Sequence, residues 1–446
     1  MAVLTRRRPR AETETGMSRL ALSTADKHAR DWFVETTRSL GCKVTVDAMG
    51  NTFAVRSGKN KDAPPTCAGS HLDTQPSGGR YDGILGVCAG VEMLKVLHEE
   101  KIETEFPAGV INWTNEEGAR FPMSMVSSGV WAGKIPLGKA HNLMEVGGGT
   151  RTMKQELERI GYLGNVDASY KAMPIGAHFE LHIEQGPILE NASQRIGIVQ
   201  GVQAYKWYTI TVRGRDCHTG TTPMEARSDA LLTAARLILC SHDITRSKDY
   251  TVASQWKESP SQPSFGKARV STGILTLSPG SVNTVPGLVK FSLDIRHPET
   301  EIVEELEKIM REAFAEVARK KYWEGEWTCI ERIPGDNGAP CEVEWNVDFE
   351  SQATKFHPDC IRCVEDASRD LFGDRVEELT RPLTSGAGHD SVFTSHRCPT
   401  SMIFVPCRRG VSHNPEEYCS PEDCATGAQV LMGSVLRFDE LRGRSG

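Results

Sequence analysis

Imidazole and carboxylate side chains cluster in a short stretch of the first third of the chain. His71 and Asp73 face the same way in an extended segment, so Asp73 is expected to accept a hydrogen bond from the far imidazole nitrogen and fix the tautomer of His71. Such a pair is typical behind a metal-bound histidine. Asp82 follows a glycine-rich turn and could bridge two cations, although capping of the helix predicted to start near Gly83 explains it equally well.

Two adjacent carboxylates, Glu116 and Glu117, follow the apolar run from Gly109 to Trp113. Like charges at the end of a buried strand repel each other unless a cation is near. A metal pair would resolve this repulsion, with one carboxylate binding metal and the other accepting a proton from water. A solvated turn is the alternative for a Glu-Glu-Gly sequence.

Further ligands come from later segments. The stretch from Ala177 to Glu184 alternates apolar and ionisable residues, which predicts a strand whose ionisable groups share one face. The stop Gln185-Gly186-Pro187 places His182 at the end of that strand, and His413 lies in a polar turn. Either histidine alone could instead be a surface or core residue. A ligand set of nitrogen and oxygen without cysteine suits zinc, manganese or cobalt.

Two features point to a carboxylated substrate. The glycine loop from Ser385 to Asp390 includes Gly388 and His389; because no Lys-Ser/Thr follows, it is not a phosphate-binding loop, and a backbone cradle for an oxyanion is the better interpretation. Arg296 ends a predicted strand, where its guanidinium could bind a carboxylate through two parallel hydrogen bonds. A surface salt bridge is the alternative for Arg296.

The elements that must position these residues form two patterns. Buried strands are predicted at residues 66–70 and 109–113, and helices at 26–40 and 84–98. From Tyr205 the order becomes strand (207–212), helix (222–240), two strands (270–277 and 288–295) and helix (300–319), which favours a compact α+β insert. The stretch from about Cys341 returns to the first pattern and is expected to complete the first domain.

Bulk properties exclude several classes of protein. A chain of 446 residues predicts two domains, and a net charge of −7 gives no footprint for nucleic acid or an anionic membrane. No apolar run is long enough to span a bilayer. Thirteen scattered cysteines are read as reduced thiols in the cytoplasm, and Cys360 and Cys363 as two thiols on one helix turn. The Arg6-Arg7-Arg8 run lacks an apolar segment behind it, so secretion is not expected; residues 1–20 are predicted to be a flexible tail.

Taken together, the motifs resemble the carbamoylase branch of the M20 metallopeptidase family, in order and over almost the whole chain beyond the tail. The run 74–76 and the block 401–406 resemble fungal β-alanine synthases (β-ureidopropionases) of that branch in particular. The blocks that carry the family resemblance are Gly69-Ser70-His71-Leu72-Asp73-Thr74, Tyr81-Asp82-Gly83, 115–121, 180–186, 218–223, 294–298, Ser385 to Asp390 and Ser412-His413-Asn414.

The resemblance implies an α/β/α di-metal catalytic domain (21–204 and 338–446) interrupted by a smaller α+β lid and dimerisation domain (205–337). It implies a general base, Glu116, assisted by Asp73, and two divalent ions, zinc in first place. The implied metal ligands are His71, Asp82 as the bridge, Glu117, His182 and His413. The implied substrate contacts are Gln185, His218, Asn283, Arg296, Gly388 and His389.

The implied reaction is hydrolysis of the ureido C–N bond of an N-carbamoyl amino acid to amino acid, CO2 and ammonia. N-carbamoyl-β-alanine is the favoured substrate; allantoate and N-carbamoyl-L-α-amino acids are the near alternatives, and a dipeptidase or a catalytically silent binding protein the distant ones. In homodimers of this kind the lid mediates pairing, and a residue like His218 can reach the partner's active site. Thr219 departs from the family, which commonly has alanine there, and puts the pocket shape in question.

Overall fold

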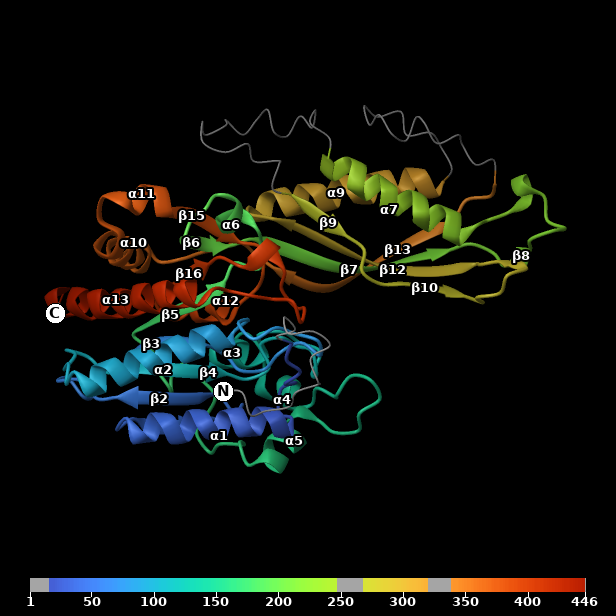
Figure 1. Cartoon of the computed structure of the whole chain (residues 1–446). Helices are drawn as coiled ribbons and strands as arrows, with labels where there is room; N and C mark the ends of the chain where they lie inside the picture. The colour runs from blue at the N-terminus through green and yellow to red at the C-terminus, as the bar shows by residue number, and fades with distance from the viewer. Residues whose placement is uncertain (1–15, 247–267, 320–337, 446) are drawn as a thin grey trace. The chain divides into compact units, whose positions relative to one another are not determined.

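The computed structural model describes residues 16–246, 268–319 and 338–445 (Figure 1). The chain divides into two compact units, which we call unit 1 (Met1–Val202 and Lys355–Gly446) and unit 2 (Gln203–Thr354). Unit 2 begins at Gln203, close to the predicted residue 205. Unit 1 resumes at Lys355, later than the predicted residue 338. The physical reason is strand β13 (Glu342–Ser351), which pairs along β7 (Ala204–Arg213) and so extends the sheet of unit 2.

Unit 1 is built on a nine-stranded sheet in the order β1-β2-β4-β3-β5-β16-β6-β14, with β15 beside β6. Strands β4, β3, β5 and β16 run parallel to one another, so their carboxyl ends lie along the same edge of the sheet. The strand bounds are β1 (Lys43–Val46), β2 (Thr52–Arg56), β3 (Thr66–His71), β4 (Ala108–Trp113), β5 (Ala177–Ile183), β6 (Ile196–Val202), β14 (Thr354–Lys355), β15 (Thr380–Ser385) and β16 (Thr400–Val405).

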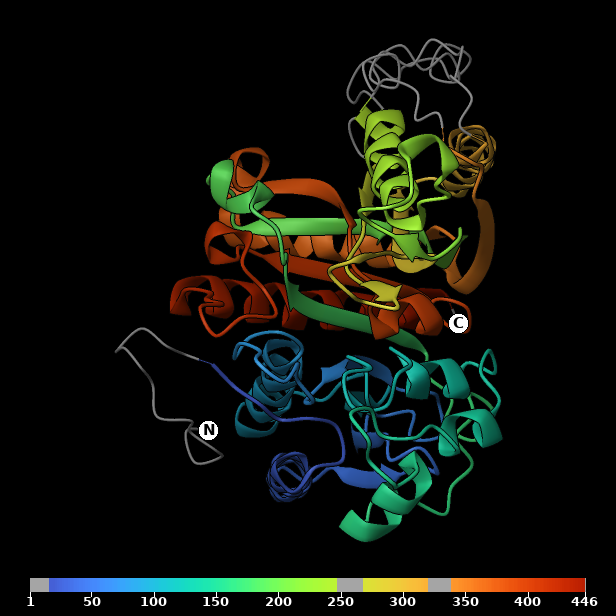
Figure 2. The same cartoon turned by 90° about the vertical axis from the view of Figure 1, so that its right-hand side faces the viewer.

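Helices cover both faces of this sheet, which gives three layers (Figures 1 and 2). Phe179, Leu181 and Ile183 of β5 pack into a core with α1, α2, α10 and α13, whereas the alternate side chains face α12. The helix bounds are α1 (Thr24–Ser39), α2 (Ile84–Glu99), α3 (Val126–Trp131), α4 (Leu137–His141), α5 (Met153–Ile160), α6 (Ile188–Asn191), α10 (Pro358–Phe372), α11 (Val376–Leu379), α12 (Asp390–Thr394) and α13 (Pro421–Ser445), with 3-10 turns at Gly373–Arg375 and Arg408–Gly410.

Local sequence signals explain two of the helices of unit 1, α1 and α2. Ser23 caps α1 by accepting a hydrogen bond from the backbone N–H of Asp26 at 3.2 Å. In α2, a Cβ added at Gly86 would collide with the carbonyl oxygen of Leu181, so this glycine allows the helix to lie against β5. The sequence predicted both helices to within two residues at each end.

Unit 2 is a five-stranded sheet in the order β10-β12-β7-β13, with β9 beside β12, and two helices pack against it. Its core joins Tyr208 and Ile210 of β7 with Leu306 and Phe314 of α9. The remaining elements are a two-stranded ribbon of β8 (Cys217–His218) and β11 (Thr284–Val285), β9 (Arg269–Ser271), β10 (Leu275–Ser278), β12 (Leu288–His297), α7 (Ala230–Arg246), α9 (Thr300–Ala318) and a 3-10 turn (Met224–Ala226).

One prediction in unit 2 was wrong. The helix expected to start at Thr222 starts at Ala230, because the Pro223 segment forms a 3-10 turn and the chain then pairs Arg215 with Ser228. The cap is Asp229, which accepts a hydrogen bond from the N–H of Leu232 at 2.9 Å. Across both units, no described helix is long and apolar enough to cross a membrane.

Candidate metal centre

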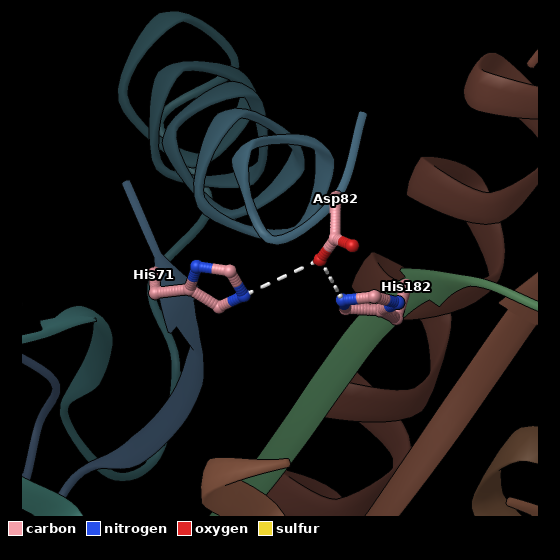
Figure 3. Close-up of side chains that lie close together, drawn as sticks. All are labelled: His71, Asp82 and His182. Carbon is pink, nitrogen blue, oxygen red and sulfur yellow. Dashed lines mark ion pairs between the residues drawn. The ribbon is translucent and has the colours of Figure 1, made fainter. Parts of the chain in front are cut away.

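Six ionisable side chains converge where the parallel strands of unit 1 end. His71 is the last residue of β3, Glu116 and Glu117 follow β4, and His182 is next to last in β5. Asp82 precedes Gly83, the N-cap residue of α2 (Figure 3), and His413 follows the 3-10 turn after β16. Segments that are far apart in the sequence therefore deliver their polar groups to one edge of the sheet.

The backbone turns sharply as it leaves the strands. Asn115, Gln185 and His413 all have left-handed backbone conformations, with φ of 58°, 57° and 55°. Such conformations are strained for residues other than glycine and concentrate at functional sites. Here they turn the chain at the points where Glu116 and His413 are presented.

The convergent groups form two sets that share Asp82. In the first set, Oδ1 of Asp82 lies 3.5 Å from Nε2 of His71 and 3.0 Å from Nε2 of His182. In the second set, Nε2 of His413 lies 3.3 Å from Oδ2 of Asp82 and 3.4 Å from Oε2 of Glu117. Within each set the candidate ligand atoms lie within 4.8 Å of one another. Asp82 thus presents one oxygen to each set, as a carboxylate that bridges two cations must do.

The two buried histidines are held with the correct nitrogen toward Asp82. Nδ1 of His71 lies 2.9 Å from the carbonyl oxygen of Asp73, and Nδ1 of His182 lies 2.8 Å from that of Ile183. A carbonyl can only accept, so each Nδ1 carries a proton, and Nε2 is the nitrogen that can offer a lone pair to a metal ion. Nε2 of His71 is buried and has no hydrogen-bond partner among the described residues. The donor set therefore fits a metal ion.

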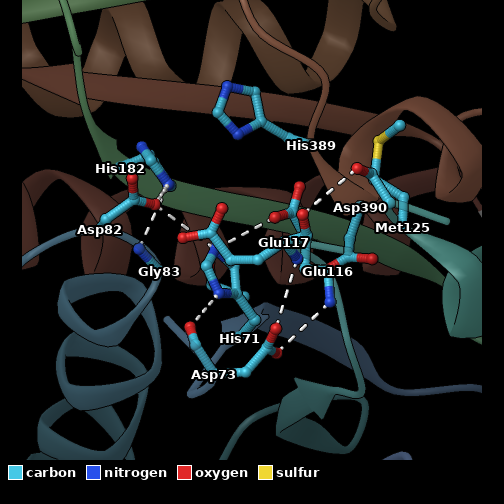
Figure 4. A network of polar contacts seen from close by, with 12 residues as sticks. His71, Asp73, Asp82, Gly83, Glu116, Glu117, Met125, His182, His389 and Asp390 are labelled. Carbon is cyan, nitrogen blue, oxygen red and sulfur yellow. Dashed lines mark hydrogen bonds and ion pairs between the residues drawn. The ribbon is translucent and has the colours of Figure 1, made fainter. Parts of the chain in front are cut away.

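Asp73 plays a different part from the one predicted. Its backbone carbonyl, rather than its carboxylate, fixes the His71 tautomer. The carboxylate instead accepts hydrogen bonds from the backbone N–H groups of Glu116 and Glu117, both at 3.3 Å. Because these two amides lie on the turn after β4, Asp73 connects that turn to the end of β3 (Figure 4).

The site holds an excess of negative charge away from water. Burial, followed by the neighbouring carboxylate of Asp82, raises the pKa of Glu117 to about 7. Burial also raises the pKa of Glu116 well above its usual range; His71 opposes this effect, while Asp390 and Glu117 add to it. Burial disfavours the protonated imidazole of His71, but the carboxylates of Glu116, Asp82 and Asp73 outweigh this effect and raise the pKa of His71 well above its ordinary value. Divalent cations would remove this repulsion.

The two adjacent glutamates differ in their surroundings. Glu117 belongs to the set with Asp82 and His413, whereas Glu116 belongs to neither set among the described residues. Glu116 is 7% exposed, and its Oε2 lies 3.5 Å from Nε2 of His71. Glu116 is thus the carboxylate placed beside the candidate metal ligands without being one of them (Figure 4).

Three of the predicted substrate contacts also belong to unit 1. Nε2 of Gln185 donates a hydrogen bond to Oδ2 of Asp82 at 2.8 Å. The ring of His389 is buried 4.5 Å from that of His182, and burial lowers its pKa to about 3. Gly388 lies in the loop between β15 and α12, next to His389. His389 is therefore a neutral imidazole at neutral pH, held by a contact of 3.0 Å between its Nε2 and Oγ of Ser385.

The other three predicted contacts lie in unit 2. His218 pairs with Thr284 in the two-stranded ribbon, so Asn283 comes close to it, and the N–H of Thr219 donates to the Asn283 carbonyl at 3.1 Å. Arg296 lies on β12 and donates from Nη2 to Oδ2 of Asp294 at 2.8 Å. The salt bridge considered as the alternative for Arg296 is thus present, and its binding of a substrate stays a prediction.

Several residues of the site were missed by sequence reasoning. Gln75 donates to Oε2 of Glu117 at 2.8 Å, and Oγ of Ser412 lies within hydrogen-bond distance, 3.0 Å, of Oδ2 of Asp82. Glu417 accepts hydrogen bonds from the backbone of the turn that carries Asp82. Each lies in the same short polar segment as a predicted ligand, which is the only signal the sequence offered.

The segment before α1 was predicted to be part of a flexible tail, yet its described residues are hydrogen-bonded to the site. Met17 pairs with Gly78, and Arg19 exchanges two hydrogen bonds with Thr74 through its backbone. Nε of Arg19, a residue only 6% exposed, donates to the carbonyl of Leu72 at 2.7 Å. Residues 16–20 thus hold the loop between His71 and Asp82. The arginine-rich run at residues 6–10 lies outside the described residues.

Comparison with known proteins decides the family. Residues 67–437 match peptidase family M20/M25/M40. This chain belongs to the M20 family. An N-carbamoyl-L-amino-acid amidohydrolase of Rhizobium meliloti is 37% identical over 426 residues, which cover 96% of this chain and 92% of that protein. An allantoate amidohydrolase of Bacillus subtilis is 30% identical over 431 residues, which cover 96% and 94%.

A solved structure agrees with this M20 assignment. The amidase of the hydantoinase/carbamoylase family from Burkholderia multivorans has a TM-score of 0.77 and 38% identity, and the match covers 95% of this chain and 92% of that one. The predicted fold class and the predicted hydrolysis of non-peptide C–N bonds are thereby confirmed. None of these three proteins is named a β-alanine synthase, so that finer likeness receives no support from them.

Proposed function

We propose that this M20 hydrolase uses two divalent metal ions to hydrolyse the ureido C–N bond of an N-carbamoyl amino acid. The observation that carries the proposal is the pair of ligand sets that share the two oxygens of Asp82, with Glu116 beside them. The relatives support the reaction class, because those reported act, by name, on carbamoyl or allantoate substrates.

The residues that would hold the metal ions are those of the two sets. His71, Asp82 and His182 would hold one ion, and Asp82, Glu117 and His413 the other. Imidazole nitrogen and carboxylate oxygen without thiolate suit zinc, with manganese and cobalt as alternatives. Two such ions, when bound, supply Lewis acidity and make water a stronger acid.

Glu116 would move the proton in this reaction. Its carboxylate is buried beside His71 and belongs to neither ligand set among the described residues, so it is available to take up and return a proton. It would accept a proton from the attacking water and return it to the leaving nitrogen. The products are then the free amino acid, CO2 and ammonia. Asp73 would assist by holding the backbone of Glu116 in place.

The amino acid released is most simply an L-α-amino acid, as the name of the Rhizobium meliloti relative suggests. The block 401–406, which favoured β-alanine in the sequence, belongs largely to β16, whose residues are all buried between β5 and β6. The resemblance of that block to β-alanine synthases therefore concerns the core of the sheet and not a substrate pocket. N-carbamoyl-β-alanine therefore becomes the second candidate, and allantoate the third.

The test is a side-by-side assay of the metal-reconstituted protein. Ammonia release is measured from N-carbamoyl-L-α-amino acids, N-carbamoyl-β-alanine, allantoate and a dipeptide control. We expect the highest kcat/KM with an N-carbamoyl-L-α-amino acid. A preference for allantoate or for the β-alanine derivative would overturn the substrate assignment, and turnover of the dipeptide alone would overturn the reaction class.

We further propose that the protein is a cytoplasmic homodimer that pairs through unit 2. Strand β10 pairs only with β12 among the described residues; Ile274 just before it is 65% exposed, and Leu275 and Leu277 within it are 44% and 40% exposed. Exposed apolar edge strands favour pairing with a second chain. The cysteines of the described residues are all free thiols, which favours a reducing compartment. Light scattering of the intact protein tests the dimer; a monomeric mass would contradict it.

A further inference from the structure

Glu417 is a fully buried carboxylate behind the candidate metal centre, with 0% of the residue exposed. Its Oε1 accepts hydrogen bonds from the backbone N–H groups of Tyr81 at 3.0 Å and of Asp82 at 3.1 Å. Its Oε2 lies 2.9 Å from Oγ of Ser412, which can donate a hydrogen bond to it. Burying a carboxylate costs free energy unless its oxygens accept hydrogen bonds. Glu417 therefore fixes the turn of Tyr81 and Asp82 relative to the loop of Ser412.

Glu417 joins the two chain segments that carry Asp82 and His413. These are the two members of the second set that do not lie on the turn after β4. One segment is the turn of Asp82, and the other is the loop of His413, whose neighbour is Ser412. Gly79 permits this contact, because a Cβ at that position would collide with the Glu417 carboxylate. A side chain there would push Glu417 off the turn.

Ser412 extends the link to the shared ligand itself. Its Oγ lies 2.9 Å from Oε2 of Glu417 and 3.0 Å from Oδ2 of Asp82, the oxygen that faces His413. A hydroxyl has one proton and can donate to only one of these carboxylates at a time. Glu417 and Asp82 therefore compete for the same proton, and the position of one carboxylate is coupled to that of the other.

We propose that Glu417 is a positioning residue that holds Asp82 and His413 at the spacing required for the second metal ion. This inference rests on the proposed two-metal function. Glu417 belongs to neither ligand set among the described residues, and its oxygens are engaged by N–H and O–H donors. Partners that orient metal ligands in this way typically contribute roughly 10- to 100-fold to metal affinity.

The variants separate positioning from simple packing. Glu417→Ala removes the three hydrogen bonds described above. Glu417→Gln keeps an oxygen for the two backbone N–H groups and places its amide N–H₂ toward Ser412, which can then donate to Asp82; it should restore binding. Ser412→Ala breaks the link to Asp82 while leaving the buried carboxylate in place. Glu416→Ala is the matched control, because the Glu416 side chain is 62% exposed and pairs with Arg409.

The experiment is a titration of the metal-free, full-length protein with Co2+. Binding is measured by calorimetry and by the visible absorption of bound cobalt. We expect two equivalents in the wild type and in Glu416→Ala. In Glu417→Ala and Ser412→Ala the second equivalent should bind roughly 10- to 100-fold more weakly, with a changed spectrum. Glu417→Gln should lie close to the wild type.

Each other outcome overturns the inference in a recognisable way. Unchanged binding of both equivalents in Glu417→Ala and Ser412→Ala would show that Glu417 only fills space. Binding in Glu417→Gln as weak as in Glu417→Ala would show that its charge, not its hydrogen bonding, matters. A wild type that binds fewer than two equivalents would instead refute the two-metal function, and this inference with it.

Discussion

Replacing Glu116 by glutamine exchanges one carboxylate oxygen for an amide nitrogen in a buried side chain whose Oε2 lies 3.5 Å from Nε2 of His71. The change keeps the shape of the side chain but removes its ability to accept and return a proton. Positioned general bases contribute about 10²- to 10⁴-fold to turnover. We therefore expect kcat for an N-carbamoyl amino acid to fall by that factor, which corresponds to about 3 to 5 kcal/mol of activation free energy.

The neighbouring carboxylate supplies the control. Glu117→Gln removes a member of the set formed with Asp82 and His413, so it should lower the metal content, whereas Glu116→Gln should leave it unchanged. Metal per chain is measured by mass spectrometry after dialysis, and kcat by ammonia release. If Glu116→Gln lost metal, or kept nearly full turnover, the assignment of Glu116 as the proton-transfer group would be refuted.

Four further outcomes follow from the geometry. Gly83→Ala and Gly161→Ala both place alanine at positive φ (68° and 75°), at a cost of about 1–2 kcal/mol. Only at position 83 would the new Cβ collide with the imidazole of His71. Only Gly83→Ala should therefore weaken metal binding in a calorimetric titration. Asp26→Ala leaves its buried arginine partner unpaired and should lower the free energy of unfolding in urea by about 3–5 kcal/mol; a loss below about 1 kcal/mol would contradict this. Burial lowers the pKa of His178 from 6.5 to about 4. As the pH falls through that window, the unfolded chain binds the proton first, so the free energy of unfolding should fall by roughly 3 kcal/mol because of this residue. His178→Gln should flatten that part of the plot of unfolding free energy against pH. Arg296→Ala should raise KM and preserve kcat, and an unaffected KM would rule out its binding of the substrate carboxylate.

The ligand types were predictable from the sequence because they sit at strand ends. Alternation in β5 and the positions of Glu116 and Glu117 after an apolar run placed carboxylates and imidazoles at the carboxyl ends of strands. The division into two sets around Asp82 was not visible from spacing, because it depends on how β3, β4 and β5 lie side by side. That order is fixed by packing, not by sequence distance.

The misjudged parts depend on long-range pairing. Nothing in the local sequence shows that residues 16–20 hydrogen-bond with the loop after His71, or that β13 extends the sheet of unit 2. The start predicted for the helix at Thr222 is wrong for a related reason. Pro223 suits the first turn of a helix, but Ser228, further along, forms a β-bridge with Arg215 instead. In each case the partner lies too far along the chain for periodicity to reveal it.

The central claim is that this chain binds two metal ions around one shared carboxylate. Anomalous diffraction from crystals of the zinc- or cobalt-loaded protein, recorded on both sides of the metal absorption edge, tests it most directly. The two-metal account predicts two anomalous peaks, one within reach of His71 and His182 and the other within reach of Glu117 and His413, with an oxygen of Asp82 toward each. A single peak, or peaks away from Asp82, would contradict it.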